Sequence, residues 1–149
     1  MKLSVNIEVD GGDVRDVLRA FNQLPKDANA ELRVQSQKLS ELLAAKIAAA
    51  GHADAAPQSS LVATTTKAKK DRVPVIDTGG TRRLGRDRAP AYKLLYGSVF
   101  GSNSYRQFHR PHRGTNAYWI FPQIEENQAM ISRAWNQAAD DVVAKWGRG

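Results

Sequence analysis

The sequence predicts an α+β fold, in which a small, mostly antiparallel sheet packs against a long N-terminal helix and a C-terminal helix. Three observations lead to this prediction. Residues 1–10 alternate between apolar and polar side chains, which is typical of a half-buried strand. Residues 25–50 and 122–146 instead repeat their apolar side chains at helical spacing. The aromatic runs at 92–100 and 118–121 indicate further strands.

The N-terminal part of the chain has clear boundaries between these elements. Gly11 and Gly12 break the first strand, and Asp13 can cap a short amphipathic helix over residues 14–24. Pro25 can serve as the first residue of the long helix, because its missing N–H is unneeded there. At 1.5 Å per residue this helix is about 38 Å long, so we expect it to span the whole domain.

Residues 52–91 are expected to form one long basic loop within a single domain of 149 residues. They consist mainly of Ala, Ser, Thr, Pro, Gly and basic residues, and they contain no aromatic residue and almost no periodicity. About forty residues is far longer than an ordinary connection, and such loops are functional or become ordered on a partner. A turn is expected at 101–104, and a second basic loop at 109–116.

The positive charge is concentrated in the middle of the chain. The net charge is +7, and residues 67–113 hold twelve of the 22 Lys and Arg but only three acids. This distribution favours a polyanionic partner, either nucleic acid or an acidic protein surface. A solvated loop that only confers solubility is the alternative explanation.

Composition excludes several classes of protein. Cysteine is absent, so disulfides and thiolate metal sites are excluded. Residues 1–20 hold no unbroken apolar run, so we expect neither a signal peptide nor an anchor there. No run of about 18 apolar residues occurs, so we expect no membrane span.

No set of residues indicates catalysis, a metal or another cofactor. Residues 75–79 match the short Asp-Thr-Gly signature of aspartic proteases, but those enzymes are nearly all β, and a polar turn ending at Gly79-Gly80 explains the motif better. His109 and His112, with His52 as a distant third, are flanked by arginines that would repel a cation. The sequence also lacks a nucleophile elbow and a phosphate-binding loop. We therefore expect a protein that is not an enzyme.

Nucleic-acid binding remains open as an alternative. Basic residues alternate with aromatic ones in the C-terminal half, as backbone contact with base stacking requires. However, no helix carries a basic stripe, and most of the aromatic residues occupy apolar strand positions that favour the core.

Several stretches together resemble a known family. After the helix over 32–50 come Val75-Ile76-Asp77-Thr78-Gly79-Gly80-Thr81-Arg82-Arg83-Leu84, then Leu95-Tyr96-Gly97-Ser98 with Tyr105-Arg106-Gln107-Phe108, and then Tyr118-Trp119-Ile120-Phe121-Pro122 before Ile124-Glu125-Glu126-Asn127. Over residues 25–146 the chain resembles the head–tail joining and tail-completion proteins in the neck of siphoviruses, the long-tailed bacteriophages.

This resemblance implies a structural virion protein made in the host cytoplasm. The subunits would form a homo-oligomeric ring, six-fold or twelve-fold, that joins or completes the tail at the head–tail interface. Its partners would be neighbouring neck and tail proteins, and DNA would pass through its lumen. A tail terminator or a head-completion stopper ring is the alternative within this class, and a basic nucleic-acid-binding accessory protein is the alternative outside it.

The expected contacts with a neighbouring subunit or partner lie in the basic loop and in residues 105–114. They are Lys67, Lys69, Lys70, Arg72, Asp77, Arg82, Arg83, Arg86, Arg88, Tyr105, Phe108, His109, Arg110, His112 and Arg113.

Overall fold

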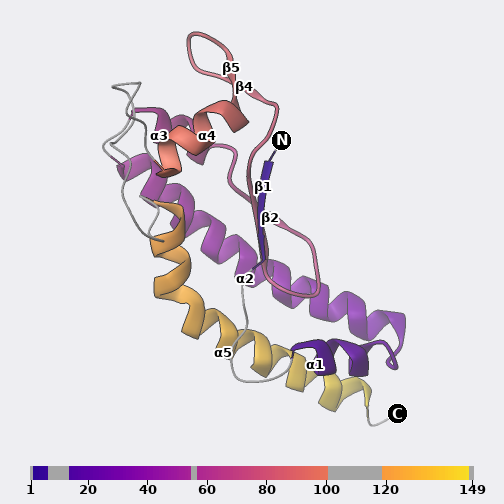
Figure 1. The fold of residues 1–149 in the computed structure, drawn as a ribbon. Helices are drawn as coiled ribbons and strands as arrows, with labels where there is room; N and C mark the ends of the chain where they lie inside the picture. Colours follow the sequence, from indigo (N-terminus) through magenta and orange to yellow (C-terminus); the bar gives the residue numbers. More distant parts are fainter. Residues whose placement is uncertain (1, 7–13, 55–56, 101–118, 148–149) are drawn as a thin grey trace.

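The computed structural model describes residues 2–6, 14–54, 57–100 and 119–147, and it confirms the predicted α+β class. Two long helices form the body of the molecule, a small antiparallel sheet lies against one of them, and a short second hairpin lies at one end beside α4 (Figure 1). The predicted break at Gly11-Gly12, the cap at Asp13 and the segments at 101–104 and 105–116 lie outside the described residues.

The two long helices are α2 (Lys26–Ala53) and α5 (Ile120–Trp146), and they pack side by side in opposite directions (Figure 1). At one end of the helix pair Trp146 donates a hydrogen bond to Glu31, and at the other end Trp119 packs against Gly51. The packing at Gly51 leaves no room for a side chain, because a Cβ there would lie 2.8 Å from the indole of Trp119. The short helix α1 (Val14–Phe21) also forms where the sequence predicts one.

Buried apolar side chains form two clusters along the helix pair. One cluster lies around α1 and the C-terminal half of α5, and its largest members are Phe21, Leu32, Trp135 and Val142. The other lies at the opposite end, and its largest members are Leu43, Ile47, Leu95, Trp119, Ile120 and Ile131. Leu39 packs against both clusters, so the core is continuous along α2.

The larger sheet has three antiparallel strands in the order β1-β3-β2, and it lies against α2. These strands are β1 (Lys2–Asn6), β2 (Lys67–Lys69) and β3 (Val75–Gly79). The first strand was predicted correctly from its alternation. The second sheet is a short hairpin of β4 (Arg83–Leu84) and β5 (Ala89–Pro90).

The predicted loop over residues 52–91 is wrong. Besides β2 to β5, this segment contains helix α3 (Pro57–Ala63), and β3 is the central strand of the three-stranded sheet. Elements of two to seven residues are too short to show a period in the sequence. The polar residues of β3 also conceal its position, because Asp77 and Thr78 are both buried.

The predicted strands at 92–100 and 118–121 are also wrong. Residues 92–100 belong to helix α4 (Ala91–Phe100), and its buried side chains recur at helical spacing: Ala91, Leu94, Leu95, Ser98 and Val99. A continuous apolar run does not by itself separate a strand from a buried helix. Helix α5 already begins at Ile120, and Pro122 lies in its first turn, where proline is tolerated.

One polar cluster ties the connection between β2 and β3 to both long helices. The carbonyl oxygen of Arg72 accepts a hydrogen bond from Ser36 Oγ of α2 at 2.6 Å and another from Trp135 Nε1 of α5 at 2.7 Å. The guanidinium of Arg72 donates to Asn22 Oδ1 at 2.9 Å and to Asn29 Oδ1 at 3.2 Å. Arg72 therefore joins its own connection to three other segments: α2, α5 and the turn between α1 and α2.

The Ser36→Ala substitution tests the contribution of this cluster. It removes one donor to the Arg72 carbonyl, and we expect the free energy of unfolding to fall by about 1–2 kcal/mol. Urea denaturation measures this change. The matched control is Lys38→Ala, which alters an exposed side chain of the same helix and should change stability by less than about 0.5 kcal/mol. Equal effects of the two substitutions would contradict the importance of the cluster.

Candidate interaction site

Four of the predicted contact residues are gathered at the hairpin of β4 and β5. We call residues 83–90 the arginine hairpin; it projects from one end of the molecule, beyond α3 and α4 (Figure 1). Arg83, Arg86 and Arg88 are exposed on the hairpin, and Arg82 is exposed directly before it. Asp87 is the single acid in this stretch.

The arginine hairpin is anchored to the core and closed by its own hydrogen bonds. Leu84 is buried in the larger core cluster, with 8% of its surface exposed. The guanidinium of Arg83 donates to the carbonyl of Arg88 at 2.9 Å, and the amide of Arg88 donates to the carbonyl of Gly85. Arg88 has a φ of 52°, in the left-handed region, as tight turns often require. The arginines are thus displayed on a defined turn.

The predicted lysine contacts lie on strand β2 and just after it. Lys67, Lys69 and Lys70 are all exposed, and β2 is an edge strand because it pairs only with β3 within its sheet. Lysines on an edge strand discourage pairing with further strands. Their presence here is therefore consistent with protection of the sheet edge as well as with contact to a partner.

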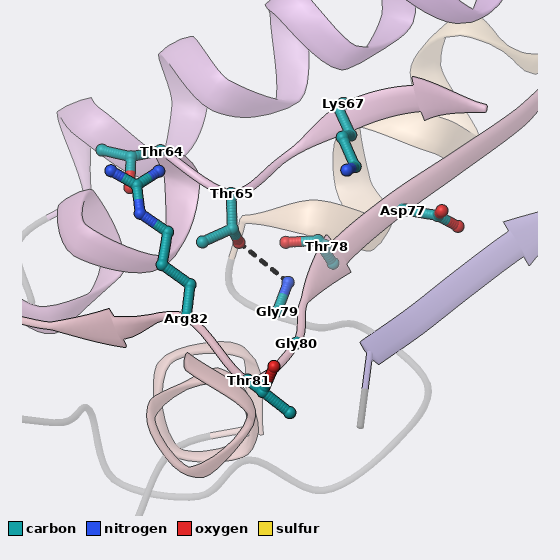
Figure 2. Close-up of a pocket in the computed structure, with 9 residues that line it drawn as sticks. All are labelled: Thr64, Thr65, Lys67, Asp77, Thr78, Gly79, Gly80, Thr81 and Arg82. Atoms are coloured by element: carbon teal, nitrogen blue, oxygen red, sulfur yellow. Dashed lines mark hydrogen bonds between the residues drawn. The ribbon is translucent and has the colours of Figure 1, made fainter. Parts of the chain in front are cut away.

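A hollow of about 560 Å³ lies between the α3–β2 turn and the segment that follows β3 (Figure 2). We call it the threonine hollow. Its lining residues are Thr64, Thr65, Lys67, Asp77, Thr78, Gly79, Gly80, Thr81 and Arg82.

Hydrogen bonds fix the walls of the threonine hollow. The Thr65 hydroxyl donates to the carbonyl of Val62 at 2.7 Å and accepts from the amide of Gly79 at 2.8 Å. The Thr64 hydroxyl donates to the carbonyl of Leu61 at 2.6 Å. Gly79 and Gly80 have φ values of 86° and 99°, which are unstrained for glycine. The sequence predicts a turn here, but Gly79 is the last residue of strand β3 (Val75–Gly79), and the positive φ values of Gly79 and Gly80 lie at the end of that strand.

Two predicted contact residues occupy other environments. Asp77 is only 3% exposed, at the centre of the three-stranded sheet, where it lies opposite Ser4 on one side and Lys67 on the other. The guanidinium of Arg72 donates hydrogen bonds to Asn22 and Asn29, so this side chain stabilises the fold of its own chain. The remaining predicted contacts lie outside the described residues: Tyr105, Phe108, His109, Arg110, His112 and Arg113.

An acid-rich surface on α5 was not predicted as a site. Glu125, Glu126, Asp140 and Asp141 are all exposed on this helix. Lys145 of α5 pairs with Glu31 of α2 at 3.2 Å, so its charge is already balanced. We call the four carboxylates the acidic face. The adjacent acids Glu125-Glu126 and Asp140-Asp141 could have indicated this surface in the sequence. However, the sequence alone does not show which side of the helix faces solvent.

The structure also describes His52, the third of the histidines that the sequence does not support as a metal site. His52 Nδ1 lies 2.7 Å from Ser60 Oγ, within hydrogen-bonding distance, at the junction of α2 and α3. Among the residues that the structure describes, no three His, Cys, Asp or Glu side chains are grouped so that they could hold a metal ion. None of the described helices is long and apolar enough to cross a membrane.

Comparisons with protein families, with curated proteins and with solved structures find no match to this chain.

The environment of Glu31 predicts a pH dependence. Trp146 Nε1 donates to the Glu31 carboxylate at 2.7 Å, and Lys145 Nζ donates at 3.2 Å. These hydrogen bonds, first that of Trp146 and then that of Lys145, lower the pKa of Glu31. Because the folded-state pKa is lowered, the stabilising effect is present above the unfolded pKa and is lost as the pH falls through the folded pKa.

NMR titration of the Glu31 carboxyl measures this effect. We expect Trp146→Phe to raise the pKa of Glu31 towards its ordinary value, and Glu31→Gln to remove this part of the acid dependence of stability. An unchanged Glu31 pKa in Trp146→Phe would contradict the role of the indole.

Proposed function

We propose that this protein is a structural subunit that assembles head to tail into a ring, like the rings that join or complete the tail at the head–tail interface of long-tailed bacteriophages. The observation that carries the proposal is the separation of charge between the arginine hairpin and the C-terminal part of the acidic face, Asp140 and Asp141. The C-terminal half of α5, which holds Asp140 and Asp141, lies at the opposite end of the molecule from the hairpin (Figure 1).

The two surfaces are complementary in charge. Residues 82–88 expose four arginines and one aspartate, whereas α5 exposes four carboxylates, and Arg133 is its one exposed base other than the paired Lys145. Opposite potentials steer two surfaces together and fix their register. A second copy of the chain therefore fits the requirements for a partner.

The position of these surfaces favours a ring over a symmetric dimer. A contact between two different surfaces of identical subunits is heterologous, so each bound copy leaves one surface of each kind available. Such contacts close into a ring when the rotation between subunits permits it. A helix pair of this length adds a rigid connection between the two surfaces, since α2 alone is about 42 Å long.

The family resemblance supports a place in the phage neck. The stretches that carry it include the α2 helix, the Asp-Thr-Gly segment in β3 and the aromatic residues that precede α5. In this proposal the ring surrounds a channel for DNA, and its other partners are adjacent neck and tail proteins. A terminator or stopper ring would use the same head-to-tail contact.

Charge reversal tests the proposed contact. Arg83→Glu with Arg86→Glu places like charges opposite the acidic face, and we expect association to weaken by roughly two orders of magnitude. Asp140→Lys with Asp141→Lys should have the same effect, and the combination of all four substitutions should restore association. Light scattering after size-exclusion chromatography measures the mass of each variant.

Arg33→Glu is the matched control, because Arg33 is an exposed arginine on α2 outside both surfaces. It should assemble like the unmodified chain. A chain that stays monomeric at every soluble concentration would overturn the proposal, as would failure of the fourfold variant to regain association.

A further inference from the structure

We infer that the threonine hollow is a binding pocket for a phosphate group, held by Arg82 and Lys67. This inference goes beyond the proposed ring, because it concerns a pocket within one subunit. Its volume of about 560 Å³ is in the range of small-molecule sites. The hollow can therefore hold a phosphate together with the group attached to it.

The two cationic side chains are available to a ligand. In Figure 2 Arg82 and Lys67 lie on either side of Thr65, with the guanidinium of Arg82 beside Thr64 and the side chain of Lys67 directed from β2 towards β3; both residues line the hollow. Within the described part of the chain, neither side chain makes a hydrogen bond or an ion pair. A guanidinium offers several N–H donors in a plane that matches phosphate oxygens, and an ammonium adds a second positive charge.

Lys67 remains available although an acid lies beside it in the sheet. Asp77 is its direct partner in the register of β2 and β3. In Figure 2 the carboxylate of Asp77 points towards β1 and away from Arg82. The charges around the hollow therefore remain positive in balance, and Lys69, Arg83, Arg86 and Arg88 add to this on adjacent strands and turns. A positive potential of this kind favours an oxyanion over a neutral or cationic ligand.

The walls add rigidity and one further donor. The Thr64 and Thr65 hydroxyls already donate to carbonyls at the end of α3, so they fix the turn and do not donate to the ligand. Thr81 is exposed at the rim and makes no polar side-chain contact with the rest of the described chain. Gly79 and Gly80 line the hollow with backbone only, although the Cβ position of Gly79 faces the buried side chain of Leu95. The geometry thus presents two cations and one hydroxyl around an open backbone surface.

The phosphate has two chemical sources that this geometry fits: a small phosphorylated molecule or the backbone of a nucleic acid. The test follows the amide NMR signals of Gly79, Gly80 and Thr81 in the full chain. The probes are inorganic phosphate, adenosine monophosphate and a short single-stranded oligonucleotide. We expect saturable shifts of these three signals. If phosphate or adenosine monophosphate also shifts these signals and displaces the oligonucleotide, the source is a small phosphorylated molecule. If only the oligonucleotide shifts them, the source is the backbone of a nucleic acid.

Arg82→Gln and Lys67→Gln should each weaken binding by about tenfold or more, because each removes a charged donor. The matched control is Arg33→Gln, which alters an exposed arginine on α2 outside the hollow and should change affinity by less than about twofold. An equal loss in all three variants, or shifts that never saturate with any probe, would overturn the inference. Repeating the titration with Asp140→Lys and Asp141→Lys separates the two proposals, because these residues lie on α5 outside the hollow, which should still bind when the ring contact is weakened.

Discussion

The carbonyl oxygen of Arg72 receives hydrogen bonds from both long helices, and much of the remaining structure depends on this contact. Ser36 approaches it from α2 and Trp135 from α5. This part-buried carbonyl is well satisfied by two donors, whereas loss of either donor leaves polar groups incompletely paired. The guanidinium of the same residue reaches the turn between α1 and α2. One residue of a short connection thus fixes the spacing of the helices and the position of the sheet.

The sheet in turn positions the surfaces proposed for function. Ser40 of α2 accepts a hydrogen bond from the amide of Val75, so the start of β3 is held against the long helix. The far end of β3 is held by Thr65, and Gly79-Gly80 then redirect the chain towards the arginine hairpin. The hollow and the hairpin therefore share one support. Their charged side chains extend from a backbone that the core and the helix pair keep in place.

The sequence predicts the parts of this fold that have a long period, and it misses the parts that do not. Helices α2 and α5 repeat their buried residues over seven turns or more, and β1 alternates over its whole length. In contrast, β2 and β3 have only three and five residues, and α4 is too uniformly apolar to separate from a strand. The charge of Lys67 and Arg82 marked them as contacts, but only the three-dimensional fold brings Lys67 and the turn at Thr64 and Thr65 beside residues 77–82. The contact of Trp135 with Arg72 links residues 63 positions apart, which no local pattern reveals.

Crosslinking between engineered cysteines tests head-to-tail assembly most directly. The natural chain has no cysteine, so Arg86→Cys on the hairpin and Asp140→Cys on α5 introduce the only two thiols. The double variant, at low protein concentration, is treated with a short bis-maleimide reagent. It should give a ladder of covalent oligomers that ends at a closed ring. Each single variant carries one thiol and can form only dimers. A double variant that gives no species beyond those of the single variants would contradict head-to-tail assembly.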